Sequence, residues 1–397
     1  MTIKPMLLAI GAAGTWLACG PQAGASVTDI LIGLDSKVAY GPEGQANVQP
    51  GADAVLVMDV SDPANPRIRA SLPLMNSLVG PPTNLQVTPD GRLGLVANSV
   101  VPVQDGTAWK TAPDDKLYVI DLAANPPKLI DTIAVGKQPS GLAISRKGDL
   151  MLIANRAGKS VSVLSIEGTT VKAIAEVPMG NEVAGVAIAP DGRRAFAVMN
   201  LANKVAVLAI DGQKVTYDKA LDIPAAFNPY NIDITPDGQY AVASSTGAGG
   251  NNGDALTVID ASGPHPHVVA LTTAGAGSEG FAFAPNGKWA VTPLLLGSGA
   301  KHSDWSYTRN GEAVLLSVGA QGAPGGAPGG ELRVVNRLPL GGLPEGVAFS
   351  PNSEYVYIGN FIDQNLQVFR IVGGKLTATG VTLKLPGQPA SMRGVAR

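Results

Sequence analysis

At three of the expected entries to first strands, an ionisable residue stands directly before a glycine: Glu279-Gly280, Glu345-Gly346 and Arg393-Gly394. Two carboxyl groups and a guanidinium that converge on one site can orient a polar substrate and supply a general acid and a general base. The alternative is a solvated rim in which Arg393 pairs with one of the glutamates. We treat Glu279, Glu345 and Arg393 as candidate catalytic residues, with both interpretations open.

Side-chain oxygens that could coordinate a metal ion are carried by four residues: Glu279, Glu345, Asn84 and Asn231. Carboxylate and amide oxygens are the ligands of hard cations such as Ca²⁺. The alternative is that the two asparagines are turn residues, because asparagine tolerates the positive φ for which other repeats use glycine. Ca²⁺ or another divalent metal is therefore a hypothesis, and the sequence establishes neither a cofactor nor a set of metal ligands.

Aromatic and polar residues of several segments expected to be loops are candidates for ligand contacts. Aromatic rings there can stack on a sugar, an aromatic ring or a partner side chain, although each ring can instead fill its own loop. His302 lies in one of these segments, whereas His265 and His267 lie in a loop expected on the opposite face. The candidate ligand-binding residues are Asn84, Tyr230, Asn231, Trp109, His302, Trp305 and Tyr307.

The composition excludes several function classes. Cys19 is the only cysteine, and it lies in a segment expected to be removed, so disulfides, thiolate catalysis, cysteine-ligated zinc and c-type haem attachment are not expected. Lys and Arg number 29 against 31 Asp and Glu, with no long run of one sign. A dedicated nucleic-acid binder normally carries a basic patch, so nucleic acid is not an expected partner.

A repeat supplies the elements that must position these residues. Each unit has an alternating apolar strand, a turn such as Pro-Asp-Gly, a second apolar strand that often ends in Asn, a third strand, and a weaker fourth strand. Four strands in about 45 residues make one propeller blade, and the 49 Gly and 31 Pro suit many short turns. The frame recurs at Pro82, Pro139, Ala184, Pro229, Ser278 and Pro344.

The two ends of the chain supply a seventh unit. Arg393–Arg397 copies Glu345–Phe349 and is predicted to form an innermost strand, and strands from the N-terminal segment complete its blade, at Ile30–Ala39, Ala54–Val60 and Ile68–Leu72. The sequence therefore predicts an all-β fold, a seven-bladed β-propeller over 26–397 closed by pairing N- and C-terminal strands in one blade. A second register, in which the motif starts at 388–391, would move Arg393 along the strand.

The unequal repeat lengths indicate which face carries function. The Pro-Asp-Gly turns belong to one face, whereas most extra residues fall between second and third strands and therefore on the other face. Long loops on a rigid scaffold commonly bind ligands, so we expect the site at the channel mouth beneath them. These long connections are Tyr40–Asp53, Ser99–Asp115, Gly247–Asp254 and Pro293–Asn310.

The series Pro-x-Gly-hydrophobic-Ala-hydrophobic-Ser, Pro-Asp-Gly and Val-Ala-Asn resembles the YVTN-type β-propeller repeat, over essentially all of 27–397. That family is related in fold to the lactonase-type propellers, some of which hold a metal in the channel through Glu, Asn and Asp side chains. The resemblance implies the fold, permits a metal without assigning its ligands, and says little about activity, because one propeller fold carries many functions.

The first 25 residues are predicted to be a secretory signal. Lys4 is the positive start, Met6–Ala18 is an apolar run too short to span a bilayer, and Ala23-Gly24-Ala25 is a small-residue cleavage site. The mature chain would begin at Ser26 and be periplasmic or secreted. The alternative is a lipoprotein anchored at Cys19, although Trp16 stands where such signals carry a small aliphatic residue.

Two functional hypotheses follow. The first, slightly favoured by the scarcity of histidine and the lack of a nucleophile motif, is an exported propeller that binds a small polar ligand or a periplasmic protein at the loop-rich mouth. The second is a lactonase-like hydrolase that uses the carboxylates at the channel mouth, with or without a divalent metal. The sequence gives no indication of oligomeric state.

Overall fold

The computed structural model describes Met1 and residues 27–249, 251–319 and 330–397. The predicted signal, with Cys19, lies outside the described residues. Regular structure in the described ranges is β-strand apart from two short 3₁₀ turns, Asn200–Ala202 and Lys219–Leu221. None of the helical segments described is long and apolar enough to cross a membrane.

The strands form seven antiparallel sheets arranged as the blades of a β-propeller, which confirms the predicted fold. From the innermost strand outward, blade 1 consists of β31 (Pro389–Arg393), β1 (Asp29–Leu34), β4 (Ala54–Asp59) and β5 (Arg67–Leu72), and blade 2 of β6 (Leu85–Val87), β7 (Leu93–Asp105), β8 (Ala108–Asp121) and β9 (Lys128–Ala134). Blade 3 consists of β10 (Pro139–Ile144), β11 (Leu150–Asn155), β12 (Ser160–Glu167) and β13 (Thr170–Pro178). Blade 4 consists of β14 (Gly185–Ile188), β15 (Arg194–Met199), β16 (Lys204–Asp211) and β17 (Lys214–Tyr217). In blade 4, a short strand β18 (Ile223–Pro224) also pairs with β16.

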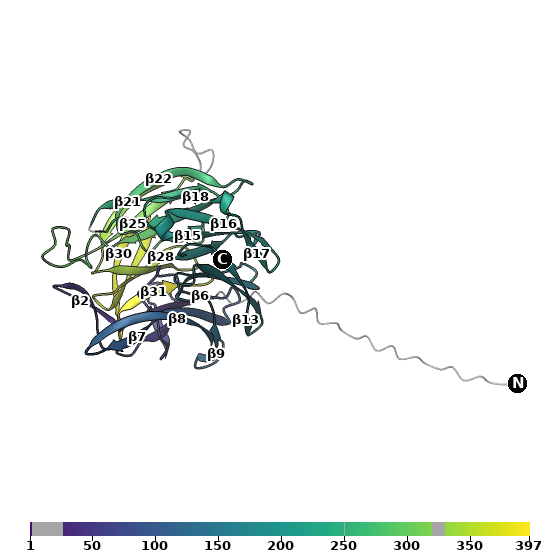
Figure 1. The fold of residues 1–397 in the computed structure, drawn as a ribbon, viewed down its shortest axis with the longest axis horizontal. Coiled ribbons are helices and arrows are strands. Elements are labelled where there is room, and N and C mark those ends of the chain that lie inside the picture. The colour runs from purple at the N-terminus through teal and green to yellow at the C-terminus, as the bar shows by residue number, and fades with distance from the viewer. Residues whose placement is uncertain (2–26, 250, 320–329) are drawn as a thin grey trace.

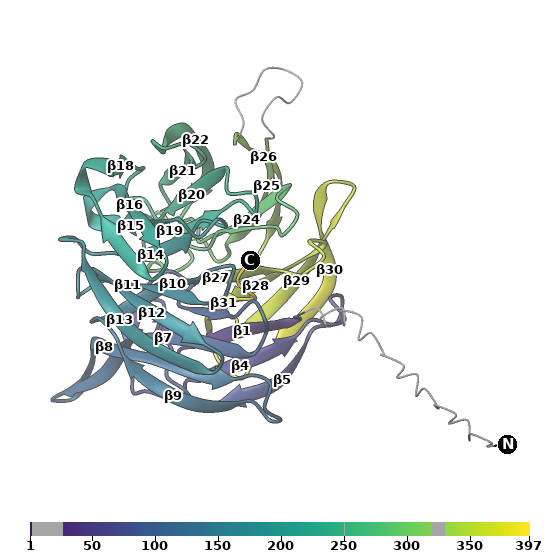
Figure 2. The ribbon, with the colours of Figure 1, turned by 90° about the vertical axis from the view of Figure 1, so that its right-hand side faces the viewer.

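Blades 5 to 7 repeat the pattern. They are β19 (Pro229–Ile234), β20 (Tyr240–Ser245), β21 (Gly253–Asp260), β22 (His267–Ala276); β23 (Ala282–Phe283), β24 (Trp289–Leu294), β25 (Glu312–Val318), β26 (Leu332–Pro339); and β27 (Pro344–Phe349), β28 (Tyr355–Asn360), β29 (Asn365–Val372), β30 (Lys375–Lys384). Inner strands such as β10, β14, β27 and β31 lie near the middle of the ring, and outer strands such as β5, β9 and β30 lie at its edge (Figure 2). Figure 1 shows the same blades in a view turned by 90°.

Blade 1 closes the ring with strands from both ends of the chain, as predicted, but in the second of the two registers. The innermost strand begins at Pro389 and ends at Arg393, with Met392 opposite Ile32. The resemblance of Arg393–Arg397 to Glu345–Phe349 was misleading. The apolar side chain of Met392 is buried against blade 7, and this packing fixes which residues form the strand. The following residues instead pair Val395 with Val87 of blade 2.

The core lies between neighbouring blades. Val163 and Ala154 of blade 3, for example, share one apolar cluster with Val186 and Ala197 of blade 4. A single blade cannot bury both of its faces, so the ring as a whole supplies the core.

The glycine of the repeat is needed where inner strands converge. A Cβ on Gly280 would lie 2.4 Å from the backbone oxygen of Glu345, and one on Gly346 would lie 2.5 Å from the backbone nitrogen of Met392. Because those contacts are with backbone atoms, the neighbouring strand cannot give way easily. The motif glycine therefore sets how closely adjacent blades approach around the channel.

Two of the predicted long loops are β-ribbons. Strands β7 and β8 stay paired as far as Asp105 and Ala108, and the connection after β1 contains the hairpin β2 (Val38–Gly41) and β3 (Gly44–Asn47). Gly106, with φ +61°, lies in the tight turn that joins β7 to β8. The extra residues of these two blades thus form ordered arms.

Candidate functional site

Two pockets lie at opposite ends of the channel. The larger, about 610 Å³, is bounded by the long second-to-third-strand connections and is called the mouth pocket here; the smaller, about 130 Å³, is bounded by the Pro-Asp-Gly turns at Pro190 and Pro236. The mouth pocket is lined by Tyr40, Gln45, Leu78, Val79, Asn228, Tyr230, Thr246, Gly247, Ala248, Gly249, Asn251, Ala276, Gly277, Glu279, Leu295, Gly297, Gly299, Ala300, Leu343 and Glu345. A pocket therefore lies at the end of the channel where the long connections gather.

Glu279 and Glu345 both line the mouth pocket, from adjacent blades. Glu345 is the second residue of β27, and Glu279 shortly precedes β23. Glu345 is only 2% exposed, while Glu279 is half-buried. With both groups ionised, Glu345 Oε2 finds no hydrogen-bond partner among the described residues. A buried carboxylate oxygen without a donor is costly, so the pair is expected to retain a proton.

The electrostatics of the pair lead to the same expectation. Burial raises the pKa of Glu279 to about 7, and a hydrogen bond to Glu345 and the positive charge of Arg156 oppose that rise. Burial, followed by the charge of Glu279, raises the pKa of Glu345 well above its ordinary value. Two close carboxyls cannot both ionise readily, so they share one proton near neutral pH. The arrangement thus provides a protonated acid and an ionisable base side by side.

Tyr230, which also lines the mouth pocket, contacts a cation that the sequence analysis did not single out. Its hydroxyl oxygen accepts hydrogen bonds from Gly80 N–H at 3.0 Å and from Arg156 Nη1 at 3.3 Å. The Arg156 guanidinium also lies 5.5 Å from the Tyr230 ring centroid and donates from Nε to Glu182 at 2.6 Å. Burial is the main cause that raises the pKa of Tyr230, so this phenol stays protonated at neutral pH.

Arg156 and Glu182 were missed because each lies in a short connection of ordinary length. Arg156 follows the Asn that ends β11, and Glu182 lies between β13 and β14. One signal was available in the sequence. The residue that follows the asparagine at the end of the second strand is the charged Arg156 in blade 3, whereas the same position holds the uncharged Ser99, Leu201 and Phe361 in three other blades. Only the closed ring brings blade 3 within reach of Tyr230 in blade 5.

Asn84 and Asn231 lie outside the lining of the mouth pocket, buried among the inner strands. Asn84 Nδ2 donates to Asn76 Oδ1 at 2.8 Å and to the Ala97 carbonyl at 2.7 Å, and Asn231 Oδ1 accepts from Thr83 Oγ1 at 3.2 Å. The Asn84 amide thus holds together its own blade and the segment before it, whereas the Asn231 amide joins blade 5 to blade 2. Within the described ranges, no three His, Cys, Asp or Glu side chains gather closely enough to hold a metal ion.

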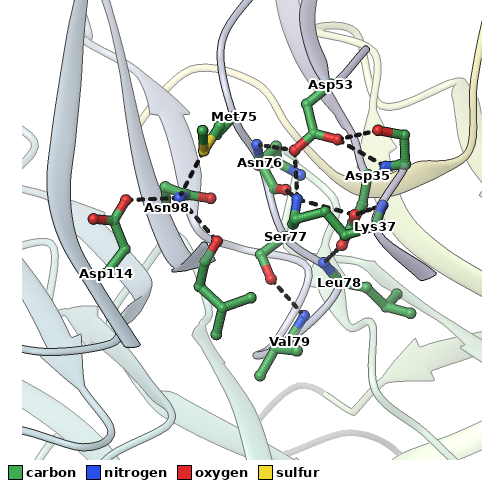
Figure 3. A network of polar contacts seen from close by, with 12 residues as sticks. Asp35, Lys37, Asp53, Met75, Asn76, Ser77, Leu78, Val79, Asn98 and Asp114 are labelled. Carbon is green, nitrogen blue, oxygen red and sulfur yellow. Dashed lines mark hydrogen bonds and ion pairs between the residues drawn. The ribbon is translucent and has the colours of Figure 1, made fainter. Parts of the chain in front are cut away.

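A buried lysine, Lys37, lies at the centre of a network of polar contacts beside the segment that precedes blade 2 (Figure 3). Lys37 is 2% exposed; its ammonium lies 3.0 Å from Asp35 Oδ1 and also bonds Asp53 and the Asn76 carbonyl. Asp35 Oδ2 in turn accepts from Leu78 N–H at 2.7 Å. The network therefore fixes the segment 76–80, which supplies Leu78 to the pocket lining and the Gly80 donor to Tyr230.

Arg393 does not join the two glutamates. It lines the smaller pocket, where its Nη1 donates to the Leu142 carbonyl at 2.7 Å and its Nη2 lies 3.9 Å from Asp233. The physical reason is the register of β31, which places Ala390 where Arg393 was expected and moves Arg393 toward the opposite end of the channel. The predicted Glu-Glu-Arg cluster is wrong in its third member.

The predicted aromatic residues of the long connections lie outside the pocket lining. Trp109 is half-buried on the β7–β8 ribbon, and Trp305 is 82% exposed. His302 and Tyr307 stack on one another, with ring centroids 4.3 Å apart. Tyr40, which was not singled out, does line the pocket, and its ring meets Phe361 edge to face at 5.9 Å.

Strained backbone gathers around the mouth pocket. Leu343, which lines it, has φ +49°, and Leu296, in the connection beside it, has φ +50°. A bulky residue with positive φ is a genuine outlier that the surrounding structure must hold in place. Asn228 and Asn251 in the lining adopt similar φ values at lower cost. Of the nine non-glycine residues with positive φ in the described ranges, three, Asn228, Asn251 and Leu343, line the pocket.

Solved structures of other proteins share this fold. A candidate 6-phosphogluconolactonase from Bacteroides uniformis matches with TM-score 0.69 and 17% identity, over 93% of this chain and 99% of its own. The periplasmic gluconolactonase of Pseudomonas aeruginosa matches with TM-score 0.63 and 18% identity, over 92% and 98%. No protein-family model matches the sequence, and no curated protein does so either. The chain is thus similar in fold to lactonase-like propellers, while membership in the YVTN repeat family is not established.

Proposed function

We propose that the mouth pocket binds a small polar molecule and that Glu279 and Glu345 hydrolyse a cyclic ester held there. The observation that carries this proposal is the proton-sharing carboxyl pair, which lies in a pocket of about 610 Å³, roomy enough for a sugar-sized molecule. The similarity in fold to a periplasmic gluconolactonase and to a candidate 6-phosphogluconolactonase supports the choice of ester.

The two carboxyls take different roles because their surroundings differ. Arg156 favours the ionised form of Glu279, whereas Glu345 is the more buried and holds its proton to higher pH. Ionised Glu279 accepts a proton from water as the hydroxide adds to the ester carbonyl carbon. Protonated Glu345 gives its proton to the ring oxygen as the acyl–oxygen bond breaks. Proton transfer from Glu279 back to Glu345 restores the pair, and the product is the open hydroxy acid.

The direct test follows hydrolysis of glucono-δ-lactone by the purified protein. We expect turnover above the spontaneous rate and a loss of about 10²-fold or more in Glu279→Gln and Glu345→Gln. The matched control is Glu167→Gln, a solvent-exposed carboxylate at the end of β12. If wild type is no faster than buffer although the lactone raises its melting temperature, the pocket is a binding site without turnover, and the alternative of a binding propeller replaces the hydrolase.

The proposed cellular location is the periplasm or the medium, on the strength of the N-terminal 25 residues. Fractionation of cells that express the full chain, with N-terminal sequencing of the product, tests this. A chain that begins at Ser26 in the soluble fraction supports export. A membrane-bound chain that begins at a lipid-modified Cys19 supports the anchored alternative.

A further inference from the structure

The charges around the mouth pocket are unbalanced. Among the described residues that line it, Glu279 and Glu345 are the only carboxylic acids, and none is Lys, Arg or His. Arg156, the cation that acts on Glu279, is already bound by Glu182 at 2.6 Å. A ligand in the pocket therefore meets acidic groups with no free positive charge to offset them.

The other cations described in this region are not among the residues that line the pocket. Arg393 lines the smaller pocket at the far end of the channel. On the rim, Arg309 pairs with Asp363 at 3.0 Å and Lys301 lies 3.9 Å from Glu43, and neither cation lines the pocket. A phosphate group carries nearly two negative charges at pH 7 and is normally held by Arg, Lys or backbone N–H clusters. The acidic groups that line the mouth pocket therefore repel a phosphate group.

The rest of the lining suits uncharged hydroxyl groups. Gln45, Asn228 and Thr246 supply neutral donors and acceptors, and four glycines of the long connections leave backbone groups open to a ligand. Tyr40 and Tyr230 add aromatic surface with polar tips. This mixture can bind a polyhydroxylated ring by hydrogen bonds without an ion pair.

We propose that the mouth pocket selects uncharged, hydroxylated ligands and rejects their phosphorylated counterparts, so that the ester hydrolysed is an unphosphorylated sugar lactone. The inference rests on the proposed function for the reaction but on the charge of the lining for the selectivity. It also accounts for product release, because the hydroxy acid that forms loses its proton to water and becomes a carboxylate, which the same acidic pair repels.

The test compares glucono-δ-lactone with its 6-phosphate at equal concentration, by kcat/KM. We expect the phosphorylated lactone to be at least about tenfold poorer, with a smaller difference at high salt, because screening weakens the repulsion. Equal or better hydrolysis of the phosphorylated lactone overturns the inference and leaves the proposed hydrolase intact. If neither lactone is hydrolysed, the hydrolase fails, and the selectivity is judged by thermal shift with glucose against glucose 6-phosphate, where the neutral sugar must bind more tightly.

A charge-insertion variant tests the cause. Ala248 is exposed and lines the pocket, so Ala248→Arg adds a cation at its edge. We expect the preference for the neutral lactone to fall at least about fivefold, by the attraction of one added charge. Ala123→Arg, an exposed alanine in the β8–β9 connection, is the matched control and must leave the preference unchanged. Equal shifts in both variants would show that net charge, and not the pocket, sets the preference.

Discussion

The backbone N–H of Gly80 donates a 3.0 Å hydrogen bond to the hydroxyl oxygen of Tyr230, which ties the segment before blade 2 to the inner strand of blade 5 across the mouth pocket. Tyr230→Phe removes the acceptor and leaves a part-buried N–H unpaired. We expect a loss of about 1–3 kcal/mol in unfolding free energy and a higher KM for the lactone. Urea denaturation and steady-state kinetics measure both. An unchanged KM would mean that this contact does not shape the pocket.

Removing the buried cation Lys37 is expected to lower the unfolding free energy more than removing the Tyr230 hydroxyl does. Lys37→Met leaves Asp35 and Asp53 buried without their cation, which we expect to cost about 3–5 kcal/mol of unfolding free energy. Burial already raises the pKa of Asp35, so this carboxylate depends on its partner. The triple variant Lys37→Met, Asp35→Asn, Asp53→Asn should recover part of the loss, because no charge is then left unpaired. A triple variant less stable than Lys37→Met would contradict this explanation.

The carboxyl pair should make stability depend on pH. A carboxyl whose pKa is raised on folding stabilises the folded state fully below its ordinary pKa of 4.5, and that contribution is lost as pH rises through about 7. We therefore expect wild type to lose on the order of 1–3 kcal/mol relative to Glu345→Gln between pH 5 and pH 8. Urea denaturation at the two pH values measures this. Glu167→Gln should follow wild type, and parallel curves for wild type and Glu345→Gln would rule out the raised pKa.

The same pair should give a bell-shaped pH dependence of hydrolysis. Activity should rise as Glu279 ionises near pH 7 and fall at higher pH when Glu345 loses its proton. The profile of kcat/KM, corrected for the base-catalysed background, tests this order. A profile flat from pH 5 to pH 9 would exclude the pair as acid and base.

Because the inner strands approach one another closely, a single methyl group added at a motif glycine is expected to lower the unfolding free energy. Gly346→Ala should lower the unfolding free energy by about 1–3 kcal/mol, because its Cβ would lie 2.5 Å from the Met392 nitrogen. Gly41→Ala is the matched control, since its Cβ meets nothing within 4 Å and its φ is not positive. Equal melting temperatures for the two variants would show that blades 7 and 1 can separate at no cost.

The exposed tryptophan of the Pro293–Asn310 connection should be dispensable for small ligands. Trp305 is 82% exposed and outside the pocket lining, so Trp305→Ala should change neither the melting temperature nor the KM for a lactone. Tyr40→Ala, in a residue that does line the pocket, is the contrasting variant and should raise KM. A raised KM in Trp305→Ala would restore this residue to the site.

Much of the fold could be predicted because local signals repeat. The alternation in Leu142-Ala143-Ile144, the Pro-Asp-Gly turns and the spacing of units specify strands, turns and blades residue by residue. Glu279 and Glu345 could be placed at the channel mouth for the same reason, since each occupies the same position in its own repeat. Arg393 could not be placed in this way, because its position depends on the register of β31, and the sequence offered a second possible start for that strand.

The sequence by itself determined the seven-bladed ring, its closure by both chain ends, and the face that carries the long connections. Only the tertiary structure decided which charges meet. Arg156, Glu182 and Lys37 lie in ordinary local contexts. Arg156 pairs with Glu182 and Lys37 pairs with Asp35 through connections of a single blade, whereas the contact of Arg156 with Tyr230 requires the closed ring. Burial then raises the carboxyl pKa values. Local patterns encode strands and turns, whereas electrostatics at the channel mouth depends on distances that no local pattern contains.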